Sequence, residues 1–281
     1  MLPQKSFGLM NQQVTVVGLG GEGVLRTYGQ SDQAREVIQE ALAQDITYFD
    51  SGRVYAESEL YYGSLWKKTP ETRSRIFQTS KSASRDKAGA LADLEQSLQR
   101  LHTHYLDLWQ IHDVRTEDEL QQIAGPGGAL EAFLEARVSG RVRFIGVTGH
   151  HDPCILTKAI REWPVDAVMM PVNPVEELLG GFLTSTLPMA KEKGIAIIGM
   201  KTLGAAHYLI PQLGITAESL IRYALSHHIT VALVGCSTPE EVRILARVGS
   251  QQKTFSEQTH SDLVEKFKPY AERLAFYRGV L

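Results

Sequence analysis

Eight short apolar runs with strand character recur along the chain at nearly regular intervals. Their starts are separated by 25 to 35 residues, which leaves room for a strand, a helix and two loops. Several runs are continuous rather than alternating, as expected for strands that are covered on both faces. The runs occupy residues 14–19, 46–50, 75–80, 106–112, 141–147, 166–172, 195–200 and 229–235. A chain with this period is constrained to repeat one strand–helix unit eight times.

Helical patterns fill the intervals between the runs. Residues 34–42 carry apolar side chains at helical spacing, behind a possible cap at Ser31. Similar stripes cover residues 91–101 and 220–225, and Thr238 opens a further helix start signal. Strict alternation of strands and helices predicts parallel strands joined by right-handed crossovers. Eight such units match an α/β fold, the (β/α)₈ TIM barrel of ~250 residues.

Two segments predict additions to this barrel. Residues 7–14 are expected to form an N-terminal β-hairpin that plugs the lower end of the barrel. Residues 256–281 predict an appended C-terminal helix, whose apolar positions are Leu263, Phe267, Tyr270 and Leu274. No linker or low-complexity segment interrupts the chain. We therefore expect residues 1–281 to form a single domain.

Composition narrows the class of protein. The formal net charge of −3 supplies no broad basic face, which argues against sequence-independent binding of nucleic acid. Cys154 and Cys236 are too few for a disulfide framework, so a reducing compartment fits. No apolar run approaches the ~18 residues of a membrane helix, and no secretory signal is apparent. We expect a cytoplasmic protein that does not bind membranes.

A glycine motif offers an alternative fold. Gly18 to Gly23 satisfy the dinucleotide-binding pattern G-x-G-x-x-G directly after a strand, and Asp50 ends the next strand. In a Rossmann fold the third glycine opens the helix that receives the pyrophosphate, but here helical signals begin only near Ser31. The motif thus favours a flexible barrel loop, and a Rossmann dehydrogenase stays the alternative.

Polar residues follow the predicted strands where the chemistry of a barrel is found. Asp50 follows the second run, Lys81 the third and His112 closes the fourth, while Tyr55 lies in the loop after Asp50. The carboxyl ends of barrel strands converge on one mouth. We expect Tyr55 to donate a proton to a carbonyl oxygen, with a pKa lowered by Lys81, which Asp50 holds in place. His112 would hydrogen-bond the carbonyl and orient it.

These segments resemble the aldo-keto reductases. FDSGRVYAESE (49–59) is similar to the family's D-T-A-x-x-Y-G-x-S-E, TSKS (79–82) to its lysine strand end, and DLWQIHD (107–113) to its D-L-x-x-x-H. The resemblance covers roughly residues 7–250, and all four catalytic positions match in order and spacing. It implies a (β/α)₈ barrel and NAD(P)H-dependent reduction of a small carbonyl substrate.

The resemblance also implies a dinucleotide across the barrel mouth, with NADPH favoured and NADH possible. The residues expected to contact it are Gly20, Gly21, Asp50, Thr148, Gly149, His150, Met169, Met200, Lys201, Gly235, Ser237, Thr238 and Glu241.

Several of these positions depart from the family's pattern. Asn173 matches the family, but Met169 replaces the usual glutamine, and Met200 replaces the tyrosine that stacks on the nicotinamide. His150 stands in place of an amide. Glu241 occupies the position of an Arg or Gln, where it would repel a 2′-phosphate or only complete a capping box with Thr238.

Loops after the first, fourth and seventh runs are expected to build the substrate pocket, and residues 115–128 to form a lid or a wall of this pocket. The pocket residues would be Tyr28, Trp109 or the segment from Val114 onward, His207 and Tyr208. No metal site is expected, because the pairs His102/His104 and His150/His151 lack Cys or carboxylate partners at ligand spacing. A second class of function stays open: a non-catalytic NADPH-binding regulatory barrel, akin to the family's channel-associated β subunits.

Overall fold

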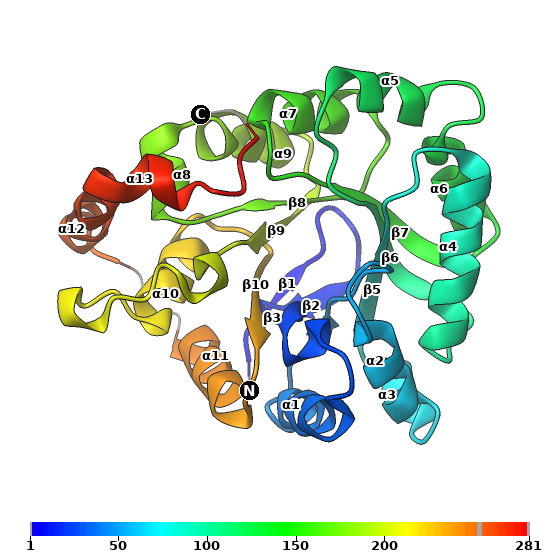
Figure 1. Ribbon diagram of the computed structural model, residues 1–281, viewed down its shortest axis with the longest axis horizontal. Helices are drawn as coiled ribbons and strands as arrows, with labels where there is room; N and C mark the ends of the chain where they lie inside the picture. Colours follow the sequence, from blue (N-terminus) through cyan, green and yellow to red (C-terminus); the bar gives the residue numbers. More distant parts are fainter. Residues whose placement is uncertain (1, 252–254, 280–281) are drawn as a thin grey trace.

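Eight parallel strands close into a barrel in the computed structural model, which describes residues 2–251 and 255–279 (Figure 1). The order around the barrel follows the chain, and β10 pairs with β3 to close it. The barrel strands are β3 (Val17–Gly23), β4 (Tyr48–Phe49), β5 (Phe77–Ser82), β6 (Leu106–Ile111), β7 (Val142–Thr148), β8 (Ala167–Pro171), β9 (Ala196–Met200) and β10 (Val231–Cys236). The (β/α)₈ prediction is confirmed, and the Rossmann alternative is wrong, because an open doubly wound sheet cannot pair its first strand with its last.

The bounds of the strands differ from the predicted runs, most clearly in the first and third. The first run is divided between the end of a hairpin strand and the start of β3, with Val16 between them. The third extends to Ser82, so Lys81 lies within β5 rather than after it. All six residues of β5 are buried, although five are polar. Buried polar side chains need hydrogen-bond partners, so β5 is a strand where polar contacts are expected inside the protein.

An N-terminal hairpin closes the lower end of the barrel, as predicted, but it spans residues 4–15 rather than 7–14. Strands β1 (Gln4–Ser6) and β2 (Gln13–Thr15) pair antiparallel. Phe7 in the turn is fully buried, and its ring centroid lies 4.7 Å from that of Phe77 and 5.5 Å from that of Phe144. The turn thereby completes the apolar interior of the barrel.

Helices form an outer layer around the strands (Figure 1). No helix among the described residues combines the length and apolar character needed to cross a lipid bilayer. The α-helices are α1 (Ser31–Ala43), α2 (Ser58–Trp66), α3 (Pro70–Arg73), α4 (Lys87–Arg100), α5 (Glu117–Ala124), α6 (Ala129–Val138), α7 (Pro153–Glu162), α8 (Pro174–Leu179), α9 (Leu187–Glu192), α10 (Ala217–Ser226), α11 (Pro239–Gln251), α12 (Glu257–Phe267) and α13 (Ala271–Leu274). Short 3₁₀ turns include η1 (Val24–Arg26) and η5 (Lys268–Tyr270), and η2 (Phe182–Thr186) is a π-helix.

The helix ends differ from prediction in two places. Ser31 is the first residue of α1 rather than its cap, and the capping residue Gln30 makes no side-chain bond. The appended C-terminal helix is broken into α12 and α13 by η5, which contains Pro269. Proline lacks the N–H that would continue the helix. Consequently Leu263 and Phe267 are buried as expected, whereas Tyr270 is 40% exposed.

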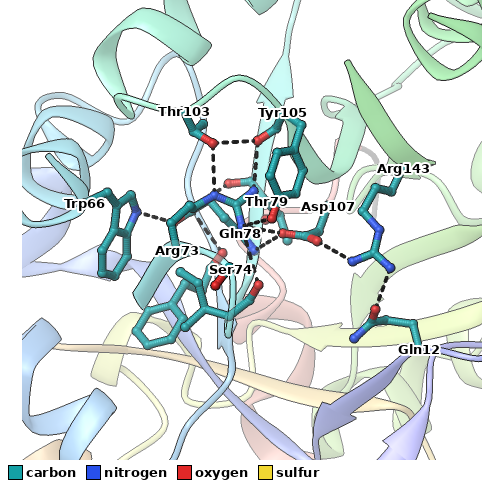
Figure 2. A network of polar contacts seen from close by, with 12 residues as sticks. Gln12, Trp66, Arg73, Ser74, Gln78, Thr79, Thr103, Tyr105, Asp107 and Arg143 are labelled. Carbon is teal, nitrogen blue, oxygen red and sulfur yellow. Dashed lines mark hydrogen bonds and ion pairs between the residues drawn. The ribbon is translucent and has the colours of Figure 1, made fainter. Parts of the chain in front are cut away.

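A polar network ties three strands and the hairpin together (Figure 2). Asp107 of β6 is buried and accepts hydrogen bonds from Arg73 (2.8 Å) and from the backbone N–H of Gln78 (2.9 Å). Its other oxygen accepts from Arg143 of β7 (2.8 Å), which in turn donates to Gln12 of the hairpin loop (2.7 Å). A buried carboxylate with this many charged partners is satisfied only while the partners keep their places.

We predict that Asp107→Asn lowers the free energy of unfolding by about 3–5 kcal/mol, since it leaves the buried Arg73 charge uncompensated. Urea unfolding followed by circular dichroism measures this loss. The control is Asp32→Asn, which removes an exposed ion pair with Arg35 (2.8 Å) and should cost less than about 1 kcal/mol. Equal losses in the two variants would contradict the role assigned to Asp107.

Candidate functional site

A buried ion pair joins the carboxyl ends of β4 and β5. Lys81 Nζ donates to both carboxylate oxygens of Asp50, at 2.6 and 2.7 Å, and to the backbone carbonyl of Ser51 at 2.6 Å. Thr79 donates a further hydrogen bond to Asp50 (2.8 Å). Both charged side chains are essentially inaccessible to solvent. All three donors of the ammonium are therefore committed to protein acceptors.

Tyr55 lies beside this ion pair, in the loop after β4, and is 8% exposed. Lys81 Nζ is 4.6 Å from the centroid of its ring. The ring contacts the backbone of Gly21, where a Cβ would lie 2.7 Å from Tyr55 Cδ2, and that of Gly52, where a Cβ would lie 3.2 Å from Cδ1. Both glycines are needed because the phenol packs against bare backbone.

The prediction of a lowered Tyr55 pKa is wrong. Burial raises the pKa of Tyr55 well above its ordinary value, and the negative charges of Asp50 and Glu22 raise it further. Because the donors of Lys81 are used by Asp50 and Ser51, none stabilises a phenolate. The hydroxyl accordingly stays protonated at neutral pH.

His112 completes the group, directly after β6. Its ring centroid is 5.5 Å from that of Tyr55, with the two rings nearly perpendicular at 75°. Burial lowers the pKa of His112 to about 3, and the Lys81 ammonium contributes to the shift. The imidazole is thus neutral at physiological pH and offers one N–H donor and one acceptor. The structure brings together all four residues that the sequence placed at the strand ends.

Asp113 is a residue of the mouth that sequence reasoning missed. It has a left-handed backbone (φ 55°), and its N–H donates to Thr148 Oγ1 at 2.8 Å. One carboxylate oxygen lies 3.1 Å from His150 Nε2, and the other accepts from Arg115 at 2.8 Å. Burial alone would raise the pKa of Asp113, but His150 and the Arg115 guanidinium hold it below its ordinary value. Its position directly after His112 was the available signal.

The C-terminal segment also reaches the mouth, which the sequence did not predict. Tyr277 is buried, and its hydroxyl donates to Glu176 of α8 at 2.6 Å and accepts from Asn173 at 3.0 Å. The Tyr277 carbonyl oxygen lies 3.0 Å from His150 Nδ1. Arg278 pairs with the same Glu176 and donates to the carbonyl of Gly180 at 2.6 Å. The amide group of Asn173 is therefore already hydrogen-bonded to this segment.

The other expected coenzyme contacts separate into two groups. Met169 is buried in the interior core of the barrel, and the glycines at 20 and 235 serve strand pairing, because a Cβ at Gly20 would lie 2.9 Å from Gly235 N. Met200 and Lys201 at the end of β9, by contrast, are partly exposed. Lys201 Nζ has no ion-pair partner among the described residues; its neighbour is the Tyr277 ring, 5.8 Å away. Gly149 packs against Val114 and Leu156.

The carboxylate of Glu241, a residue of α11, lies at the N-terminal end of that helix. Ser237 N donates to Glu241 Oε2 at 2.6 Å, and Glu241 N donates to Thr238 Oγ1 at 3.3 Å. Nearby Arg243 pairs with Glu40 (3.0 Å) and Glu240 (2.9 Å). Glu241 thus accepts from the Ser237 N–H, a donor that an anion would otherwise use.

Two of the predicted pocket residues, Trp109 and Tyr208, pack against helices. Alternate residues of a barrel strand face the helices, and Trp109 is one of these. It is buried outside the barrel interior and stacks on Phe133 of α6, with the ring centroids 3.6 Å apart. Tyr208 is buried against the C-terminal helices and donates to Leu274 O at 3.0 Å. Tyr28 is 76% exposed, His207 is also exposed, and Val114 is fully buried. Residues 115–128 contain helix α5, whose Leu120 and Ile123 are anchored in the core; whether this segment is a lid or a wall of the pocket stays a prediction.

Comparisons with known proteins agree on one family. The model of the aldo/keto reductase family matches residues 16–209. The L-galactose dehydrogenase of Arabidopsis thaliana is 25% identical, over 90% of this chain and 92% of that protein. A Glycine max protein named as a probable aldo-keto reductase is 26% identical over 72% of this chain, which spans only 60% of that protein's length. The crystal structure of an aldo/keto reductase from Klebsiella pneumoniae with NADP and acetate has a TM-score of 0.72 at 19% identity, covering 92% of each chain.

We predict that Gly21→Ala destabilises the fold by about 1–3 kcal/mol, because the new methyl group overlaps the Tyr55 ring. A double-mutant cycle with Tyr55→Ala, measured by urea unfolding, should give a coupling of about 0.5–3 kcal/mol, since removing the ring relieves the overlap. Purely additive losses would show that Gly21 is required for another reason.

Proposed function

The chain belongs to the aldo/keto reductase family, and from this premise we propose that it reduces an aldehyde or ketone to the alcohol, with NAD(P)H as the source of hydride. The observation that carries the proposal is the position of Tyr55 at the C-terminal mouth of the barrel, between the ammonium of Lys81 and the imidazole of His112. The bound nicotinamide would supply hydride to the carbonyl carbon. The chain's own residues would supply the proton and orient the carbonyl oxygen.

Tyr55 is proposed as the acid. As hydride reaches the carbonyl carbon, negative charge develops on oxygen, and the phenol O–H donates its proton there. Its raised pKa keeps the proton on Tyr55 at neutral pH, which suits reduction better than alcohol oxidation. The adjacent Lys81 charge stabilises the phenolate left behind, through the ring contact rather than through a hydrogen bond.

We propose that His112 and the Asp50–Lys81 pair position the reacting groups and do not themselves transfer a proton. The neutral imidazole can donate an N–H to the carbonyl oxygen without competing as an acid. Asp50 holds the Lys81 ammonium by two hydrogen bonds and so fixes the charge beside Tyr55.

The residues of the mouth fit a dinucleotide on the side of β9. Lys201, half-buried and without an ion-pair partner in the described part of the chain, supplies a free cation for a pyrophosphate. Thr148 keeps a hydroxyl proton to donate, because its Oγ1 acts as an acceptor for Asp113. Met200 would pack on the nicotinamide ring, as thioethers do on aromatic faces.

For the coenzyme we propose NADPH. The Klebsiella pneumoniae structure holds NADP, and a Schizosaccharomyces pombe relative, 26% identical, is named for NADP(+). The Glu241 carboxylate at the start of α11 opposes a 2′-phosphate there, so NADH is the competing coenzyme. A non-catalytic sensor has no support among these relatives, whose names are those of reductases and dehydrogenases.

We predict that Tyr55→Phe loses ~10²–10⁴-fold in kcat for a small aldehyde, because the proton donor is removed while the ring remains. Fluorescence titration with NADPH and with NADH should give dissociation constants within about twofold of the unmodified protein, since the phenol does not bind the dinucleotide. Steady-state absorbance at the NADPH band measures turnover.

The matched control is Tyr28→Phe, which removes an exposed hydroxyl from the loop after η1. It should leave both kcat and coenzyme affinity unchanged. Near-normal turnover by Tyr55→Phe would refute the acid assignment. An absence of turnover by the unmodified protein across a panel of aldehydes and ketones would refute the proposed activity.

We predict a flat pH profile for reduction of a neutral aldehyde between pH 6 and pH 9. Tyr55 stays protonated because its pKa is raised, and His112 stays neutral because its pKa is lowered to about 3. Neither group changes charge in this window, so kcat should vary by less than about threefold. A titration centred near the ordinary pKa of histidine that disappears in His112→Gln would contradict this assignment of charge.

A further inference from the structure

Three potential metal ligands meet where α8, the end of α10 and α12 come together. None of them belongs to the candidate site formed by Asp50, Tyr55, Lys81 and His112. They are Glu177 of α8, His227 at the C-terminal cap of α10 and His260 of α12. One ligand atom of each lies within 4.8 Å of the other two. His260 Nε2 and Glu177 Oε2 are already 2.7 Å apart. Helices distant in sequence thus direct two imidazoles and a carboxylate at one point.

Aromatic rings surround this cluster. The ring of Tyr223 lies 4.8 Å from that of His227 and 4.9 Å from that of His260, measured between centroids. The Tyr223 hydroxyl donates to Glu177 Oε2 at 2.5 Å, which fixes the orientation of the carboxylate. Carboxylates that bind metals are commonly held by such an outer hydrogen bond.

His227 has an unused nitrogen in this setting. Its Nε2 is buried and has no hydrogen-bond partner among residues 2–251 and 255–279. A buried polar atom without a partner carries a cost that a ligand can relieve. Glu177 and His260 are partly exposed, with side-chain exposures of 37% and 25%, so solvent can deliver a ligand to the cluster.

We propose that Glu177, His227 and His260 form a binding site for a divalent transition-metal ion such as Zn²⁺, which fastens α12 to α8 and α10. Two imidazoles and one carboxylate are a donor set that Zn²⁺ accepts, with water as the fourth ligand. Bonds of ~2.0–2.1 Å require ligand atoms about 3.3 Å apart in a tetrahedral site. The present separations, 2.7 Å between Glu177 and His260 and within 4.8 Å for the other pairs, lie close to this value.

The position of the site gives it a structural consequence. Glu177 follows Glu176, whose carboxylate holds Tyr277 and Arg278 of the C-terminal segment. The helices α12 and α13 pack on α8 through a separate apolar cluster that includes Leu263 and Phe267. A metal ion between α8 and α12 therefore stabilises the docking of the whole segment that reaches the barrel mouth.

The sequence predicted no metal site because a metal-binding motif is visible in a sequence only when its ligands are closely spaced. Glu177, His227 and His260 are separated by 50 and 33 residues, so no local pattern joins them. The fold alone places them together.

The test uses tag-free protein treated with EDTA and then titrated with Zn²⁺ by calorimetry. We expect one Zn²⁺ per chain, and a more than tenfold loss of affinity in each of Glu177→Gln, His227→Gln and His260→Gln. The matched control is His228→Asn, next to His227 but exposed, with a left-handed backbone (φ 57°) that asparagine tolerates. Its affinity should be unchanged. Circular dichroism verifies that each variant is folded.

Titration with Co²⁺ adds a readout that a structural defect does not imitate, because a four-coordinate complex gives visible absorption. The double variant His227→Gln/His260→Gln should show neither this band nor Zn²⁺ binding at one equivalent. Retention of either by the folded double variant, or no stoichiometric binding by the unmodified protein, would overturn the proposal.

Hydrogen exchange tests the fastening of α12. Amides of residues 257–267 should exchange several-fold more slowly when one equivalent of Zn²⁺ is added. Unchanged protection in α12 despite stoichiometric binding would refute the structural role.

Discussion

Closure of the barrel by the parallel pairing of β3 with β10 is the constraint on which the rest of the structure depends. Once the first and last strands pair, the carboxyl ends of all eight strands must lie around one rim, and residues from positions 50 to 201 face one another there. The pairing needs Gly20 and Gly235, because a Cβ at either position would collide with the opposite strand or the residues beside it. The hairpin fills the other end with Phe7, so only one end is left for chemistry.

The buried pair of Asp50 and Lys81 is the electrostatic centre of the candidate site. Burial of two charges is costly unless all their hydrogen-bonding groups are satisfied, and here two carboxylate oxygens, a carbonyl and a threonine hydroxyl satisfy them. Because all three donors of Lys81 are used, Lys81 cannot also donate a hydrogen bond to Tyr55. Its charge acts on the phenol across the ring, at 4.6 Å, and the phenol keeps its proton. A protonated phenol here is what the proposed role of Tyr55 as proton donor requires.

Helix α8 connects this centre with the C-terminal helices. Its capping residue Asn173 and its Glu176 bind Tyr277, while the next residue, Glu177, faces His260 of α12. The segment after the barrel is therefore part of the mouth and not only a cover for its outside. A metal ion at Glu177, His227 and His260 would act on the mouth through this helix, without contacting the reacting atoms.

The sequence by itself determined the alternation of eight strands and helices, because continuous apolar runs and helical stripes are local patterns with a fixed period. It also predicted that Asp50, Tyr55, Lys81 and His112 lie at one mouth, since polar residues at the ends of buried strands stand out against apolar neighbours. Tertiary structure decided the rest. Trp109 and Tyr208 are aromatic residues near strand ends, yet packing turned them toward helices rather than the mouth. The direction of the Tyr55 pKa depended on burial and on which acceptors claimed the lysine donors. The contacts of Asp113 and Tyr277, and the meeting of Glu177 with two histidines, join residues far apart in the chain. Such pairings follow from three-dimensional packing, which no local period encodes.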